Sequence, residues 1–332
     1  MIDALIQLAL FSAKSLIITA IILIILIAFF VLLAKSKEKI KGRLTIKNLN
    51  KKYEEISEEL LMEILPKKQF KKFMKDKKHE EKSKNKDEKP QKNIFVLNFH
   101  GDVRASAVCN LREEINAILN IATPHDEVIV RIDSPGGVVH GYGLAAAQLI
   151  RIRTRNIPLI VAIDKVAASG GYLMSCIANK IIAAPFAIVG SIGVVVQLPN
   201  FHRLLKEKNI DFEQQTAGEF KRTITMFGHN TEEGREKLRE EIEDIHQQFK
   251  NLIVEYRPTV DIQKVATGEH WLAQQTLALN LNLVDEIKTS DDYLLERSKE
   301  ANLYEISYET KKPFLSRLSA TASMLRDKLY GY

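Results

Sequence analysis

Short apolar runs alternate with helical patterns from residue 94 onward, and this alternation constrains the fold more than any other feature of the chain. The runs are continuously apolar and rich in β-branched residues, which is typical of strands buried on both faces of a parallel sheet. We therefore expect an α/β fold with parallel strands and helices packed outside the sheet. The expected strands cover 94–101, 126–137 with its terminal turn, 158–166, 180–185 and 190–197, and the expected helices cover 106–120, 141–153, 170–178, 232–257 and 269–281.

An uncharged run of 19 residues, 16–34, lies near the N-terminus. About 20 apolar residues are enough to span the hydrocarbon layer of a membrane as a helix. The run is followed by KSKEKIKGR rather than by a small-residue cleavage pattern, so it predicts an uncleaved membrane anchor and not a signal peptide. The lysines after the run predict a cytoplasmic location for the rest of the chain.

The basic charge of the chain is concentrated beside this run. Residues 35–93 hold 20 Lys and Arg against 11 Asp and Glu, although the whole chain carries only +6. This distribution fits a membrane surface better than a nucleic acid, with a solvated spacer as the alternative. A short helical pattern ends near Pro66, and residues 74–93 are expected to be a disordered spacer.

These observations divide the chain into four parts. We expect a membrane anchor (1–34), a basic extension (35–93), a globular domain (94–290) and a C-terminal helical tail (291–332). The two cysteines, Cys109 and Cys176, are expected to be buried thiols rather than a disulfide. No Cys/His cluster has metal-ligand spacing, so the sequence predicts no metal site.

Two glycine-rich turns follow neighbouring predicted strands. They are DSPGG at 133–137 and AASGG at 167–171. Because the carboxyl ends of parallel strands meet at one edge of a sheet, both turns are expected at the same edge. Bare backbone N–H groups there can stabilise an oxyanion. Ser169 lies in the second turn, so that its hydroxyl and the Gly170 N–H could face one reacting carbonyl.

A serine hydroxyl is a weak nucleophile without a base. His140 and His202 are the best histidine candidates, although neither is flanked by the small or apolar residues expected around a buried base. Lys221 lies in the loop-like stretch TAGEFKRTIT. A lysine can accept a proton only when burial keeps its amine uncharged. Composition and spacing alone do not select Lys221.

Five segments resemble the signal peptide peptidase A family of serine proteases, and within it the SohB-type inner-membrane members. They cover nearly all of 94–290 in the same order. The segments are DSPGG at 133–137, DKVAASGGYLMSCIANKIIAAP at 164–185, GSIGVV at 190–195, GEFKRT at 218–223 and TGEHWLAQQ at 267–275.

The resemblance implies a ClpP/crotonase-like fold, which is a spiral of ββα units, and a Ser-Lys catalytic dyad that needs no cofactor. Ser169 matches the family nucleophile, and Lys221 matches the general base. The positions that match the oxyanion hole are Gly136, Gly137 and Gly170. Ser191 matches a position that holds the lysine amine in place.

The resemblance also implies a membrane-anchored endopeptidase that hydrolyses peptide bonds through an acyl-enzyme, acting on signal-peptide remnants or other membrane-associated peptides. The implied partners are peptide or protein substrates, the lipid bilayer of the bacterial inner membrane and further copies of the chain, with no nucleic acid. Relatives work on the periplasmic side, which conflicts with the lysines after the anchor, so the orientation stays open. Asn282 replaces a glycine that the family often has, and we expect it to keep the left-handed turn.

Three other interpretations stay open. A crotonase-like acyl-CoA enzyme would share the fold and the oxyanion geometry but would use a carboxylate and no nucleophile. A ClpP-type Ser-His-Asp peptidase would need a histidine about 25 residues after Ser169, where VGSIGVVVQ has none. A catalytically silent membrane scaffold would use the fold only for assembly.

Overall fold

The structure is a computed structural model that describes residues 14–24, 26–27, 42–84 and 91–309. The chain divides into two units, one of residues 44–308 and one of 1–43 with 309–332. In the second unit, the described residues 14–24, 26 and 27 are helical and exposed. No helix within the described ranges is long and apolar enough to cross a membrane. The predicted anchor, 16–34, lies partly outside the described residues.

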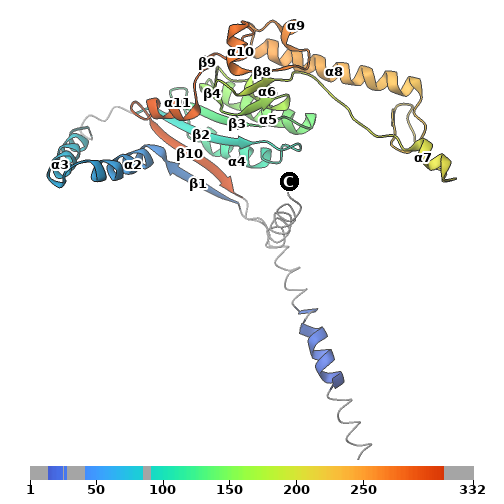
Figure 1. The fold of residues 1–332 in the computed structure, drawn as a ribbon, viewed down its shortest axis with the longest axis horizontal. Coiled ribbons are helices and arrows are strands. Elements are labelled where there is room, and N and C mark those ends of the chain that lie inside the picture. The colour runs from blue at the N-terminus through green and yellow to red at the C-terminus, as the bar shows by residue number, and fades with distance from the viewer. Residues whose placement is uncertain (1–13, 25, 28–41, 85–90, 310–332) are drawn as a thin grey trace, which may run out of the picture. The chain divides into compact units, whose positions relative to one another are not determined.

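A seven-stranded sheet forms the centre of the larger unit (Figure 1), in the order β1-β10-β2-β3-β4-β6-β9. All neighbouring strands from β10 to β9 are parallel, as the apolar runs predict. The strands are β1 (Arg43–Asn48), β2 (Asn93–His100), β3 (Glu127–Asp133), β4 (Leu159–Ile163), β6 (Lys180–Ala183), β9 (Glu286–Ile287) and β10 (Asn302–Glu309).

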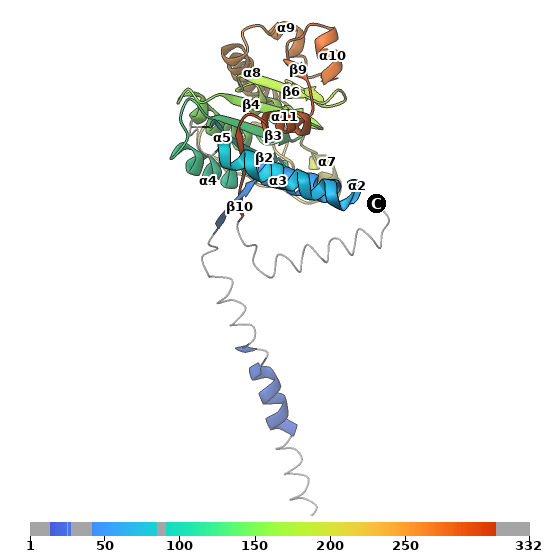
Figure 2. The same ribbon diagram turned by 90° about the vertical axis from the view of Figure 1, so that its left-hand side faces the viewer.

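Helices cover both faces of this sheet. Successive residues of a strand point to opposite faces, so Leu97 and Phe99 of β2 pack on one side and Val96 on the other. The first side carries α4 (Val108–Leu119), α5 (Val139–Arg153) and α6 (Gly170–Ser175). The second side is covered by α11 (Ser290–Arg297), with Leu294 in its core (Figure 2).

A second, three-stranded sheet lies at the carboxyl edge of the first. It consists of β5 (Val166–Ala168), β7 (Ile188–Gly190) and β8 (His270–Leu272). The expected strand 158–166 is therefore two strands, β4 and β5. The strand expected at 190–197 is wrong, because β7 ends at Gly190 and residues 191–197 are not a strand. Gly190 and Ser191 both have positive φ, which interrupts an extended strand at that point.

Helix α8 (Glu232–Tyr256) extends away from the sheet and carries α7 (His202–Glu207) near its far end (Figure 1). Only its C-terminal turns reach the core, through Phe249 and Ile253. At its other end, Gly234 packs against Thr223. At 1.5 Å per residue, Gly234 and Phe249 are about 22 Å apart along the helix. We call residues 198–231, which lie at this distance, the arm.

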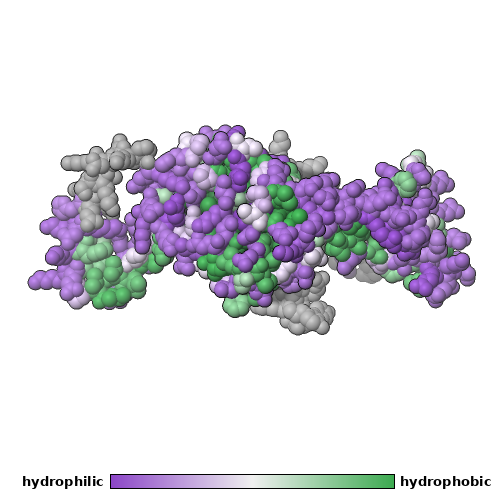
Figure 3. All heavy atoms as spheres, turned by 90° about the horizontal axis from the view of Figure 1, so that it is seen from above, coloured by the Kyte–Doolittle hydropathy of each residue, from purple (hydrophilic) through white to green (hydrophobic). Residues whose placement is uncertain are grey.

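The basic extension is more ordered than expected. It contains β1 and the helices α2 (Leu49–Ile64) and α3 (Lys67–Lys84). Residues 74–84, expected to be disordered, are helical because Lys and Glu are good helix formers and because Lys77 bonds to Glu58 of α2 at 2.7 Å. Residues 85–90 lie outside the described residues. Exposed aliphatic side chains of α2, Ile56, Leu60 and Ile64, contribute to an apolar patch on this hairpin (Figure 3).

The segment 302–309 is a strand, although the sequence predicts a helical tail from 291 to 332. Leu303 joins the core on one face of the sheet and Ile306 the core on the other, so β10 lacks an alternating apolar pattern. Residues 310–332 of the predicted tail lie outside the described residues. The remaining short helices are α9 (Ile262–Val265) and α10 (Ala273–Ala278). The helix expected over 269–281 is shorter than predicted, because residues 270–272 form β8.

Two smaller expectations have different outcomes. Cys176 is buried as expected, whereas Cys109 is exposed on α4. Asn282 keeps the left-handed turn with a φ of 55°. Its side-chain amide donates to Thr259 O at 2.9 Å, which secures this turn beside α8.

The buried carboxyl of Glu114 on α4 gives a test of the packing. Its side chain is 5% exposed and accepts a hydrogen bond from Tyr308 N at 2.8 Å. Burial raises the pKa of Glu114 from 4.5 to about 7. The folded chain therefore holds this proton more tightly than the unfolded chain, and the resulting stabilisation is present below about pH 4.5 and lost as the pH rises towards 7.

We expect Glu114→Gln to be more stable than the unchanged chain at pH 8, by about 1–3 kcal/mol, and similarly stable at pH 4.5. Thermal unfolding of the purified chain at both pH values measures this difference. Glu113→Gln, on the same helix but more exposed, serves as the control and should not reproduce the effect. An equal effect of the two substitutions at pH 8 would contradict the interpretation.

Candidate active site

The two glycine-rich turns predicted from the sequence lie side by side. Ser134 N donates to Val166 O at 2.9 Å, and Ala168 N donates to Ser134 O at 3.1 Å. The turn after β3 is thereby paired with β5. A Cβ at Gly136 would lie 2.7 Å from Gly170 N and 2.8 Å from Ser169 Cβ, so only glycine permits this approach.

Ser169 precedes α6 in a conformation that L-residues rarely adopt, with φ 51° and ψ −117°. Its N–H donates to Gly190 O at 2.8 Å, and its carbonyl accepts from Leu173 N at 2.9 Å. Bonds on both sides of the residue thus hold the strained backbone, which costs on the order of 1–3 kcal/mol. Its Oγ makes no hydrogen bond to any described residue and is partly exposed. A hydroxyl presented this way is available for attack.

The backbone N–H groups of the two glycine turns differ in their hydrogen bonding. Gly170 is the first residue of α6, so its N–H has no partner within the helix. The N–H of Gly137 has no hydrogen-bond partner in the described part of the chain. The N–H of Gly136, which the resemblance also assigns to the oxyanion hole, donates to Ser134 Oγ at 3.1 Å in this structure. Gly137 and Gly170 are therefore the free donors, and Gly136 shapes the turn.

Ser191 is beside Ser169. Ala168 of β5 pairs with Gly190 of β7, and the two serines are the next residues on these strands. Ser191 also has a positive φ, of 51°, and its N–H donates to Glu269 O at 2.6 Å. The structure thus brings this predicted supporting residue to the nucleophile.

Lys221 is not at this site within one copy of the chain. It is exposed and lies in the arm, in a turn where its N–H donates to Gly218 O at 3.2 Å. The neighbouring Phe220 ring lies 5.4 Å from Lys237 Nζ, near the start of α8. Lys221 helps to line a cavity of about 790 Å³ formed by the arm itself, with Leu198, Gln214, Gln215, Thr216, Ala217, Arg222, Ile224, Thr225, Met226 and Phe227.

Neither of the two histidine candidates forms a hydrogen bond with the hydroxyl of Ser169. His140 is exposed at the start of α5. His202 lies in the arm, where its ring packs edge-on against His229 at 5.7 Å. Neither histidine makes a described hydrogen bond to Ser169.

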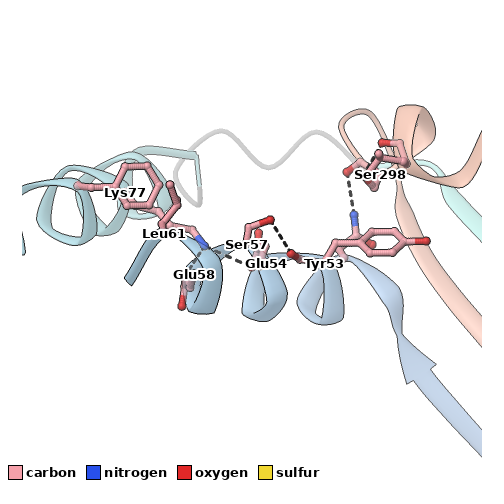
Figure 4. A pocket seen from close by; sticks show the side chains of 10 residues that line it. Tyr53, Glu54, Ser57, Glu58, Leu61, Lys77 and Ser298 are labelled. Atoms are coloured by element: carbon pink, nitrogen blue, oxygen red, sulfur yellow. Dashed lines mark hydrogen bonds and ion pairs between the residues drawn. The ribbon is translucent and has the colours of Figure 1, made fainter. Parts of the chain in front are cut away.

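Two further cavities are lined by residues other than Ser169 and the glycines of the two turns. One of about 280 Å³ is enclosed by α2, α3 and α11, where Lys77 points to Glu54 and Glu58 (Figure 4). Another, of about 310 Å³, is polar and is lined by Asn98, His100, Arg131, Ile132, Asp133, Asp164 and Lys165. Neither contains a residue that the sequence predicts to be functional.

Sequence reasoning missed two buried residues next to the site, Ser134 and Tyr142. Ser134 is fully buried and Tyr142 is 1% exposed, and their hydroxyl oxygens are 2.5 Å apart. Two features of the sequence could have indicated them. Ser134 lies inside DSPGG, and Tyr142 lies in the first turn of the next helix. A buried tyrosine hydroxyl needs a hydrogen-bond partner, which this serine can supply.

Comparison with known proteins identifies the family. The model described as "Peptidase family S49 N-terminal" matches residues 3–149, and the model described as "Peptidase family S49" matches residues 151–304. The chain therefore belongs to peptidase family S49, a family of serine-type peptidases. It is an SohB-type member of this family, because its sequence is similar to those of proteins named SohB.

One relative is the "Probable protease SohB" of Haemophilus influenzae, 54% identical over 69% of this chain and 64% of that protein. Another is the "Probable protease SohB" of Buchnera aphidicola subsp. Schizaphis graminum, 46% identical over 97% of this chain and 96% of that protein. A solved structure of a mutant 1510-N membrane-bound stomatin-specific protease with a substrate peptide has a TM-score of 0.42 and 13% identity over 63% of this chain and 80% of that one.

The backbone strain at Ser169 leads to a stability prediction. Glycine adopts positive φ without the steric cost that alanine meets, although it loses more entropy on folding. We expect Ser169→Gly to be more stable than Ser169→Ala by about 1 kcal/mol. Chemical denaturation of the two variants measures the difference.

Ser175, in the same helix with ordinary helical geometry, is the matched control. There the order should reverse, with Ser175→Gly less stable than Ser175→Ala by about 1 kcal/mol. Finding alanine favoured over glycine at both positions would show that Ser169 is not strained.

Proposed function

We propose that the chain is a serine endopeptidase whose Ser-Lys dyad is shared between neighbouring copies, with Ser169 from one and Lys221 from the next. The observation that carries this proposal is the conformation of Ser169, whose free hydroxyl lies between the unpaired N–H of Gly170 and the turn that contains the unpaired N–H of Gly137. Membership of peptidase family S49 supports the reaction class.

In this reaction Ser169 Oγ attacks the carbonyl carbon of the substrate peptide, and its proton passes to the neutral amine of Lys221. The carbonyl oxygen becomes an oxyanion that accepts hydrogen bonds from Gly137 and Gly170. Collapse of this intermediate breaks the C–N bond, and Lys221 returns the proton to the leaving amine. Water, deprotonated by Lys221, then attacks the acyl-enzyme and releases the acid. Ser191 would position the amine.

The position of Lys221 supports sharing between copies. Lys221 lies in the arm, about 20 Å from the core-facing end of α8, and its side chain is exposed. A basic amine stays uncharged only where it is withdrawn from water, so another surface must cover it. The arm and the residues before it expose unusually many apolar side chains, which a neighbouring copy would bury: Val195, Val196, Leu198, Phe201, Leu204, Ile210, Phe212, Phe220 and Phe227.

Mixing two inactive variants tests this arrangement. Ser169→Ala and Lys221→Ala should each lower kcat on the order of 10³-fold or more. Co-assembled copies would recover about a quarter of the activity, because one site in four then combines an intact serine with an intact lysine of its neighbour. Peptide hydrolysis by the co-expressed mixture measures the recovery.

Two controls make the result specific. Co-assembly of Ser169→Ala with the double variant should stay inactive, and Lys206→Ala, which removes another exposed lysine of the arm, should be fully active. No recovery in the mixture, with a wild-type chain that is active, would place the dyad within one copy. If a serine-reactive phosphonate labels the wild type no more than Ser169→Ala and no peptide is cut, the chain is a silent scaffold.

The proposal also covers the type of fold and the attachment of the chain to a membrane. The order of elements supports a ClpP/crotonase-like spiral, since β4, β5 and α6 make one ββα unit and β6 and β7 begin the next. The uncharged run 16–34 supports an anchor in the bacterial inner membrane. Substrates at that membrane would be peptides such as signal-peptide remnants.

We expect the full chain to sediment with membranes and to resist extraction by alkaline carbonate. Replacing Leu23 and Ile24 by arginine places two charges in the middle of the run, each costing about 2.5–3.5 kcal/mol in a bilayer, and should release the chain. The same double replacement at Ile121 and Leu279, which are exposed and lie outside the arm, is the control for added charge. Release of the unchanged chain by carbonate would refute the anchor, and a phosphatase fused after residue 332 reports the side of the membrane.

A further inference from the structure

A chain of buried hydroxyl groups supports the turn that holds Gly137. Gly136 N–H donates to Ser134 Oγ at 3.1 Å. Ser134 Oγ lies 2.5 Å from Tyr142 OH, and Tyr142 OH donates to Asp102 O at 2.8 Å. Four groups from three different segments are therefore joined in one series of hydrogen bonds.

The direction of every bond in this series is fixed. The carbonyl of Asp102 can only accept, so the single proton of Tyr142 points to it. Ser134 must then donate its own proton to the Tyr142 oxygen, which leaves a Ser134 lone pair for the Gly136 N–H. Burial raises the pKa of Tyr142 above its usual value, so the phenol keeps its proton at neutral pH.

The far end of the series is itself held in place. Asp102 O accepts a second hydrogen bond, from Ala105 N at 2.9 Å. The Asp102 carboxylate accepts from Ser106 N at 2.8 Å and from Ser106 Oγ at 2.7 Å. The loop after β2 is thus closed on itself, and it gives the series a rigid end point.

The ring of Tyr142 touches the other half of the site. A Cβ at Gly170 would collide with Cγ and Cδ2 of this ring, so the start of α6 rests directly on it. Phe99 packs edge-on against the same ring, with ring centroids 6.3 Å apart. The hydroxyl of Tyr142 therefore holds the turn of Gly137 in place through Ser134 and Gly136. The ring of Tyr142 supports Gly170 directly.

We propose that Tyr142 is a positioning residue that sets the separation of the two oxyanion donors, the N–H groups of Gly137 and Gly170. This inference rests on the proposed peptidase function. The residue touches neither substrate nor nucleophile. Both N–H groups must point to the position where the oxyanion develops, and Tyr142 keeps them aimed there. Misplacement of one donor would reduce the stabilisation of the transition state and leave substrate binding unchanged.

Tyr142→Phe keeps the ring under Gly170 and removes only the hydroxyl. Ser134 then loses its acceptor and can turn away from Gly136. Removal of a whole oxyanion donor costs about 10²–10³ in kcat, and loosening one should cost about tenfold. We expect kcat of Tyr142→Phe to fall about tenfold with KM within about twofold of wild type. Ser134→Ala should match it, and the double variant should be no worse than either alone, because each breaks the same series.

Tyr172→Phe is the matched control. Tyr172 is also fully buried, lies in α6 and donates to a single backbone carbonyl, Leu283 O, at 3.0 Å. Both variants lose a hydrogen bond donated to a backbone carbonyl, and Tyr142→Phe loses in addition the bond accepted from Ser134, so its thermal stability should fall at least as far. Only Tyr142→Phe should lose kcat, whereas a merely structural role would lower the activity of both in proportion to their stability.

Amide hydrogen exchange separates this inference from the proposed function. In the wild type the Gly136 amide is bonded, and peptides covering 134–138 should exchange faster in Tyr142→Phe but not in Tyr172→Phe. Unchanged exchange in Tyr142→Phe would overturn the inference whether or not the chain cleaves peptides. Faster exchange with a wild-type kcat would also overturn it. Absence of Ser169-dependent hydrolysis in the wild type would instead refute the peptidase proposal.

Discussion

The backbone pairing of Ser134 with Val166 and Ala168 is the interaction on which the site depends. It joins the end of β3 in the large sheet to β5 in the small one. Without it, the two glycine turns would be separate loops. With it, a residue of one turn, Gly136, comes within van der Waals distance of the other turn, and the absence of a side chain becomes a requirement of the geometry.

Burial of both sheet faces explains why the backbone can keep an unfavourable conformation at Ser169. The turn is connected to β7 through Gly190 and to α6 through Leu173, and both of these elements contribute buried residues to the main core. Relaxation of one residue would disturb packing that is worth far more than the strain it relieves. The same rigidity keeps the N–H groups in place before any substrate arrives, as electrostatic stabilisation requires.

The sequence predicts the parallel sheet and the contact between the two turns, because apolar runs and glycine clusters report local structure and the edge where strands end. It does not predict β10, whose Leu303 and Ile306 face opposite cores, or the helical state of 74–84, which depends on a partner helix. The sequence also does not predict the bond from the Gly136 N–H to Ser134 Oγ, because only the folded chain brings this hydroxyl close. Lys221 was assigned by resemblance alone, and the structure places it exposed on the arm. No local pattern in the sequence indicates this position.

The uninterrupted course of α8 has a consequence for assembly. Since a helix advances 1.5 Å and turns 100° per residue, the number of residues between Phe249 and Gly234 fixes both the reach and the angular phase of whatever the far end presents. A single inserted residue would leave the sheet and the turns intact, yet it would rotate the arm and its exposed Lys221 by more than a quarter turn relative to the sheet. In the assembly that we propose, the spacing between active centres would therefore depend on the length of this helix.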